Sequence, residues 1–117
     1  MQYPTVEHAY QAQKTLNKTI RLAVARIGSA GAAKKFGRLI DLRPDWELVK
    51  VPIMRELIRL KFPVGGCLSE ELLATYPCVL VEGNTWGDIF WGICEGRGTN
   101  HLGRLLMERR AQLMEKQ

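Results

Sequence analysis

The sequence predicts a mostly α-helical fold with a minor β element, an α+β domain. Apolar residues recur at helical spacing along most of the chain, one short run is typical of a strand, and a glycine-rich aromatic stretch precedes the last helix. The 117 residues, 46% hydrophobic and 25% charged, contain no linker, repeat or low-complexity segment. One compact domain over residues 1–117 is therefore expected.

The first predicted helix follows Pro4 and runs to about Leu16. Thr5 suits its N-cap, because a threonine hydroxyl can accept a hydrogen bond from an amide of the first turn. Glu7 adds a negative charge in that turn, where the helix dipole favours one.

The next apolar run covers residues 20–27 and stops at Gly28, a residue typical of helix ends. Ser29 can then cap a short helix that ends near Gly37. Residues 38–43 are expected to form a connection.

A longer helix is expected to begin at Pro44, because proline lacks the amide hydrogen that the first helical position leaves unused. Pro52 lies inside the same pattern and should kink or split the helix. The predicted apolar stripe of this helix consists of Trp46, Val49, Ile53, Leu57 and Leu60.

In the C-terminal part, Ser69 opens another predicted helix and residues 78–81 are the one strand candidate. Residues 82–99, rich in glycine and aromatic residues, are expected to form a loop. Asn100 should cap the final helix. One side of that helix is formed by Leu102, Leu105, Leu106, Arg109 and Leu113.

Composition excludes several classes of protein. The chain has neither a run of about eighteen apolar residues nor an apolar stretch behind a basic stub, so a cytoplasmic protein without membrane contact is expected. Its three cysteines, Cys67, Cys78 and Cys94, form no C-x-x-C pair and are expected to be reduced thiols. With only two histidines besides, no metal site is expected.

The net charge of +5 favours anionic ligands such as phosphate or nucleic acid without naming one. Much of the basic charge falls on predicted helix faces. A solvated helix surface is therefore preferred over a nucleic-acid footprint.

One face of the first predicted helix carries Glu7, Gln11 and Lys14 at i, i+4 and i+7. A carboxylate, an amide and an amine in a row can line a polar cleft. The alternative is structural, because a first-turn glutamate also stabilises the helix dipole and a lysine is usually solvated.

Residues 82–92 place Trp86 and Trp91 beside Asp88 and among glycines, including Gly92. Such aromatic side chains offer a flat surface on which a base can stack, with a carboxylate beside it. An equally supported alternative is a core-packing loop in which Asp88 caps a turn.

Residues 95–100 bring glycines and Arg97 to the helix that begins at Asn100. A guanidinium and a helix N-terminus are the components of a phosphate cradle. The segment matches neither a P-loop nor a dinucleotide-binding fingerprint.

These blocks resemble the NADAR/YbiA-like family, in order and over nearly the whole chain. The resemblance is carried by residues 3–14 (YPTVEHAYQAQK), 42–46 (LRPDW), 61–62 (KF), 82–92 (EGNTWGDIFWG) and 100–108 (NHLGRLLME). It implies the compact single-domain fold of that family. Family members usually carry a further N-terminal element before the Tyr-Pro-Thr block, and this sequence begins almost at that block.

The resemblance implies N-glycosidase activity on ribosylated guanine-like substrates, without a metal or another cofactor. One substrate class is the phosphoribosylamino-pyrimidine type of riboflavin-pathway intermediate. The other is ADP-ribosylated guanine in DNA or RNA, whose de-ADP-ribosylation belongs to antitoxin and phage-defence settings. The sequence does not indicate an oligomeric state.

Carried over by motif, the catalytic residues of the family fall on Glu7, Lys14 and Asp88. Glu7 is expected to move a proton or activate water, Asp88 to orient the ribose or the amine, and Lys14 to act as a nucleophile. Substrate binding is assigned to Trp46, Gln11, Trp86, Trp91, Gly92, Arg97 and Asn100.

The charge of +5 and the start near the Tyr-Pro-Thr block favour guanine attached to nucleic acid as the expected substrate. The riboflavin-pathway intermediate is the alternative within the same activity. A non-catalytic basic module that binds nucleotides or nucleic acid is the alternative from another class, and it would not need Glu7.

Overall fold

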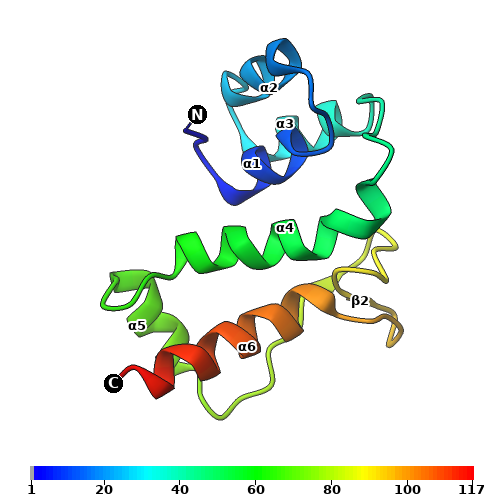
Figure 1. Cartoon of the computed structure of the whole chain (residues 1–117). Coiled ribbons are helices and arrows are strands. Elements are labelled where there is room, and N and C mark those ends of the chain that lie inside the picture. Colours follow the sequence, from blue (N-terminus) through cyan, green and yellow to red (C-terminus); the bar gives the residue numbers. More distant parts are fainter. Residues whose placement is uncertain (1) are drawn as a thin grey trace. The chain divides into compact units, whose positions relative to one another are not determined.

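The computed structural model describes residues 2–117, and the mostly helical α+β fold predicted from the sequence is confirmed (Figure 1). These residues form six α-helices and one two-stranded sheet. They divide into two compact units at Leu57, which are described in turn. None of the described helices is long and apolar enough to cross a membrane.

The first unit begins with α1 (Val6–Ala12), which Thr5 caps as predicted by accepting a hydrogen bond from the His8 amide. The helix ends at Ala12 and not near Leu16. The Lys14 amide donates to the Gln11 carbonyl, so the chain tightens into turns of the 3₁₀ type after α1.

Helix α2 (Lys18–Ala25) starts before the predicted apolar run, because the Asn17 side chain accepts from the Ile20 amide and caps the helix. Helix α3 (Ala30–Gly37) has the predicted bounds, with Ser29 as its cap. Both helices pack against α1. The core between them is formed by Ala12, Val24 and Ile40, with Tyr3, Ile20 and Phe36 packed against it.

Helix α4 (Trp46–Lys61) begins two positions after Pro44 and is not split at Pro52. Pro52 removes only the hydrogen bond to the Leu48 carbonyl, and both residues are exposed, where water can bind that carbonyl. The predicted stripe is partly wrong, because Leu60 is exposed. The buried residues of α4 are Trp46, Met54 and Ile58, whose separations of eight and four residues place them on one face.

The second unit contains α5 (Cys67–Ala74) and α6 (His101–Glu115), which pack against each other. Helix α5 starts before Ser69, and this serine is not its cap. Ser69 is fully buried and donates to the Pro63 carbonyl, so its hydroxyl anchors the preceding turn.

The face of α6 that packs inward contains Leu105, Arg110 and Leu113, all buried. Leu105 and Leu113 belong to the predicted apolar side, whereas Arg110 was not expected there. Its guanidinium donates to Thr75 Oγ1 at 2.9 Å and to the Cys78 carbonyl at 2.8 Å, so the buried charge is hydrogen-bonded.

The predicted strand at residues 78–81 is wrong, since these residues form neither strand nor helix. The two strands, β1 (Gly83–Asn84) and β2 (Ile93–Cys94), lie in the segment expected to be a loop, and they pair in parallel. The side chains of Arg110 on α6 and of Asn100 just before it bind the carbonyls of Cys78 and Leu80 in place of a neighbouring strand. The minor β element therefore lies after the apolar run and not within it.

Candidate functional site

The predicted row on α1 is partly confirmed, because Glu7 and Gln11 contact each other on one face of the helix. Gln11 Nε2 donates to Glu7 Oε2 at 3.2 Å. Gln11 is buried, whereas Glu7 is half-buried and keeps access to solvent. One oxygen of the carboxylate is thus held by a buried amide, while the side chain of Glu7 stays partly exposed to solvent.

Lys14 lies in the turn after α1 and not on the helix, yet its amine still belongs to the same cluster. Its Nζ donates to the Gly37 carbonyl at 3.4 Å, at the end of α3. Burial lowers the pKa of Lys14 from its usual 10.5, and the nearby cations Arg38 and Lys34 lower it further, while Glu7 opposes the shift. A larger fraction of the amine is therefore neutral at a given pH than in a solvated lysine.

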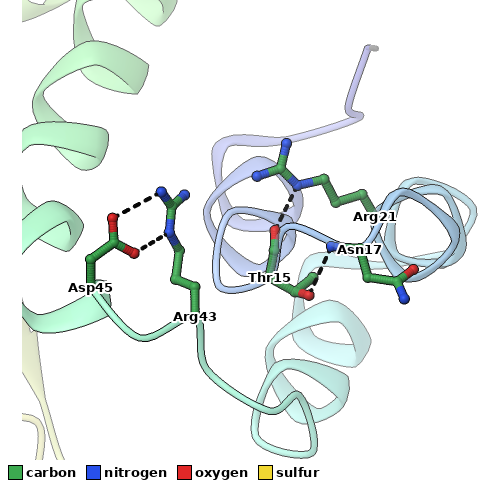
Figure 2. A network of polar contacts seen from close by, with 5 residues as sticks. All are labelled: Thr15, Asn17, Arg21, Arg43 and Asp45. Carbon is green, nitrogen blue, oxygen red and sulfur yellow. Dashed lines mark hydrogen bonds and ion pairs between the residues drawn. The ribbon is translucent and has the colours of Figure 1, made fainter.

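The turn that carries Lys14 is fixed by hydrogen bonds from other segments, as Figure 2 shows for its neighbour Thr15. Arg21 Nε donates to the Thr15 carbonyl at 2.7 Å, and Thr15 Oγ1 accepts from the Asn17 amide at 3.1 Å. The Arg43 amide donates to the Lys14 carbonyl at 2.7 Å. The backbone of Lys14 is thus held from both sides.

Arg43 also pairs with Asp45 through two hydrogen bonds of 2.6 and 3.1 Å (Figure 2). This guanidinium lowers the pKa of the Asp45 carboxyl. Sequence reasoning missed the pair, although the spacing of two residues makes it visible in the sequence. It fixes the segment that joins Lys14 to the start of α4 at Trp46.

Trp46 is buried and packs against Tyr10, with ring centroids 5.2 Å apart. The Tyr10 ring also lies 5.9 Å from Lys14 Nζ. Trp46 thus supports the ring that lies beside the lysine. The first unit therefore brings together four predicted residues and adds Tyr10 and Gly37, which sequence reasoning missed.

In the second unit, Asp88 caps a turn, as the structural alternative expected. Its Oδ1 accepts from the amides of Phe90 at 3.1 Å and Trp91 at 2.9 Å. The Asn84 side chain holds the Asp88 backbone by accepting from its amide and donating to its carbonyl. Both turn hydrogen bonds fall on Oδ1, so they leave Oδ2 for other partners.

The aromatic residues of this segment differ in exposure. Trp86 is exposed, at 58%. Trp91 is half-buried and meets Phe90 edge-on, with centroids 4.8 Å apart, while the His101 ring lies 4.4 Å from Phe90. Trp86 is therefore the more exposed of the two tryptophans.

Gly92, just before β2, is buried against the backbone of Glu82, just before β1. A Cβ at this position would overlap the Glu82 carbonyl, whose oxygen accepts from the Ile93 amide at 2.8 Å. A glycine is needed here so that β1 and β2 can approach each other. Its assignment to substrate binding stays a prediction.

Asn100 stands at the N-cap position of α6, but its side chain does not cap the helix. Nδ2 donates to the Leu80 carbonyl at 2.9 Å, and Oδ1 accepts from the Glu82 amide at 3.0 Å. Its backbone is left-handed, with φ of 54°. The buried amide thus fastens residues 80–82 to the start of α6.

The first two amides of α6 are also engaged by protein. The His101 amide donates to the Phe90 carbonyl at 3.1 Å, and the Leu102 amide donates to the Trp91 carbonyl at 3.0 Å. These two amides of the predicted phosphate cradle are therefore not free to bind a phosphate. Arg97 is exposed at the end of a tight turn closed by two hydrogen bonds with Cys94, so only its guanidinium remains as a candidate anion ligand.

Comparison with known proteins agrees with this fold. The NADAR domain model matches residues 1–114. N-glycosidase YbiA of Escherichia coli (strain K12) is 45% identical over 114 residues, which cover 95% of this chain and 71% of that protein. The chloroplastic riboflavin biosynthesis protein PYRR of Zea mays is 40% identical over 128 residues, 96% of this chain and 20% of that protein.

A solved structure shows the same similarity in three dimensions. The NMR structure of the E. coli protein YbiA has a TM-score of 0.86 and 43% sequence identity, over 97% of this chain and 69% of that one. The family resemblance drawn from the sequence blocks is confirmed. The chain belongs to the NADAR family.

Proposed function

We propose that this protein is an N-glycosidase that hydrolyses the bond between a ribose and the amine of a guanine-like base. The observation that carries the proposal is the cluster of Glu7, Gln11 and Lys14, a hydrogen-bonded carboxylate and a half-buried lysine of lowered pKa. Its presence in a chain similar to a protein named N-glycosidase supports this activity.

The chemistry requires charge stabilisation and one proton. As the C–N bond breaks, positive charge develops at the anomeric carbon and the departing amine takes up a proton. Glu7 supplies that proton or, in its ionised form, activates water. In the overall reaction, water adds a hydroxyl to the anomeric carbon and a hydrogen to the amine.

Lys14 offers a covalent route to the same products. Its neutral amine attacks the anomeric carbon, the base leaves as the protonated amine, and opening of the sugar gives a Schiff base that water hydrolyses. Burial of Lys14 favours this route, because it favours the neutral amine. The role that the family resemblance implies for Asp88, orienting the ribose or the amine, stays a prediction.

For the substrate, we favour a phosphoribosylamino-pyrimidine of the riboflavin pathway. The observation behind this choice is the similarity to a protein named for riboflavin biosynthesis. ADP-ribosylated guanine in nucleic acid is the second candidate, supported by the charge of +5 and the exposed Arg97.

The test is mass spectrometry of both substrate types incubated with the protein. We expect release of the free amine and of the ribose product from the pyrimidine intermediate, and release by Glu7→Gln that is slower by a factor on the order of a hundred. Release of ADP-ribose from modified guanine alone would reverse the choice of substrate. A protein that binds both compounds and returns them intact is a binding module, and the proposal would then be wrong.

A further inference from the structure

The Gln11 amide is buried, yet only one of its two polar atoms has a partner. Nε2 donates to Glu7, whereas Oε1 has no hydrogen-bond partner anywhere in residues 2–117. A buried carbonyl oxygen without a partner destabilises a fold. The arrangement therefore needs an explanation beyond stability.

The orientation of this amide is set by Glu7. If the amide were turned over, Oε1 would face the carboxylate and repel it, and the donor would be lost. Oε1 is instead directed at Gly37, the last residue of α3.

Gly37 leaves the space that the Gln11 amide occupies. A Cβ at Gly37 would overlap Oε1 and stand 2.5 Å from Cδ of Gln11. No left-handed backbone explains the glycine, since Gly37 is absent from the positive φ positions. Glycine is also a poor helix residue. The close approach of the amide is thus the reason for a glycine here.

The same residue contacts the second reactive group of the site. The Gly37 carbonyl accepts a hydrogen bond from Lys14 Nζ. Gly37 therefore contacts the Gln11 amide that holds Glu7, and its own carbonyl binds Lys14.

We infer that Gly37 is a positioning residue of the proposed N-glycosidase, because its missing side chain admits the Gln11 amide that holds the Glu7 carboxylate. The inference rests on the proposed function. Supporting hydrogen bonds of this kind restrict a reactive carboxylate to one orientation. Gln11 accordingly acts through Glu7 and is also a positioning residue.

The test is Gly37→Ala with Gly31→Ala as the matched control. Gly31 lies in the same helix, and a Cβ there would meet nothing within 4 Å. We expect Gly37→Ala to fold, because the atoms it displaces are the far end of a flexible side chain. Its kcat should fall about tenfold with little change in KM, as for lost supporting contacts, and Gly31→Ala should keep both values.

A double-mutant cycle shows whether the effect passes through Gln11. If it does, adding Gly37→Ala to Gln11→Ala should cause no further loss of kcat. Losses that multiply in the double variant, or a normal kcat in Gly37→Ala, would overturn the inference.

An NMR measurement separates this inference from the proposed function. In the wild type, one side-chain amide proton of Gln11 should respond to titration of Glu7, and this response should disappear in Gly37→Ala but not in Gly31→Ala. A wild type with this response but no turnover contradicts the proposed function alone. A response that survives in Gly37→Ala contradicts the positioning role, whatever the turnover.

Discussion

His8 joins the helix that carries Glu7 to the end of α2 by a hydrogen bond to Ile27. The ring is fully buried, and its Nε2 lies 2.9 Å from the Ile27 carbonyl. A carbonyl can only accept, so Nε2 carries the proton. In the neutral ring, Nδ1 then accepts from the Thr5 hydroxyl at 2.7 Å, and Thr5 in turn accepts from the His8 amide.

This relationship predicts that His8→Ala destabilises the protein. The change leaves the Ile27 carbonyl without its partner and opens a cavity, for a loss on the order of 2 kcal/mol or more. Urea unfolding of the variant measures the loss, and Thr19→Ala, exposed on α2, is the control. A His8→Ala midpoint equal to that of Thr19→Ala would show that the bridge contributes nothing.

Glu7→Gln is expected to lower turnover while keeping the fold. The amide that replaces the carboxylate can still accept from Gln11 Nε2, so the local hydrogen bond survives. Loss of proton transfer should reduce kcat by a factor on the order of a hundred. Steady-state rates measure the loss of kcat, and thermal unfolding of the same preparation shows whether the variant is folded. A folded variant with a near-normal kcat would remove Glu7 from the mechanism.

The parts of the fold that the sequence predicts well depend on local hydrogen bonds. The hydroxyls of Thr5 and Ser29 each bind an amide three residues away, so a short stretch of sequence contains all the information needed. The absent strand at 78–81 shows the converse. Its carbonyls bind Asn100 and Arg110, which are distant in sequence, and no local pattern indicates these partners.

The candidate site was predictable to a similar extent. Helical spacing places Glu7 beside Gln11, but it also places Lys14 on the helix, where the structure has a turn. The contact of Lys14 with Gly37 depends on the packing of α3 against α1, which periodicity does not determine. Turn-capping by Asp88 was an open alternative, because aspartate is common in turns.

Lys14 is expected to be trapped as a covalent adduct when borohydride is added during turnover. Since burial lowers its pKa, the adduct yield should rise with pH through a midpoint below 10.5. Glu7 raises this pKa, so Glu7→Gln should move the midpoint to lower pH. Mass spectrometry of the adduct measures both effects. An adduct that persists in Lys14→Ala would assign the nucleophile to another amine.

Asp88→Asn separates the two tasks of Asp88. An asparagine oxygen can keep the turn hydrogen bonds from Phe90 and Trp91, whereas the negative charge is lost. We expect stability close to that of the wild type, with turnover reduced about tenfold or more. Asp88→Ala should in addition lose about 1 kcal/mol of stability. Normal turnover in Asp88→Asn would restrict the residue to its turn.

Phosphate recognition is expected to depend on the Arg97 side chain, because backbone carbonyls occupy the first two amides of α6. A charge-assisted hydrogen bond contributes about 1.5 to 3 kcal/mol, so Arg97→Ala should raise KM at least about tenfold. Its kcat should change little, since the phosphate is remote from the bond that breaks. Arg104→Ala, exposed on α6, is the control.

The dependence of KM on salt then identifies the substrate class. A free phosphoribosyl compound offers one phosphate and a shallow dependence, which we expect, whereas binding to nucleic acid releases many cations and weakens steeply with salt. A steep dependence that becomes shallower in Arg97→Ala would favour modified nucleic acid.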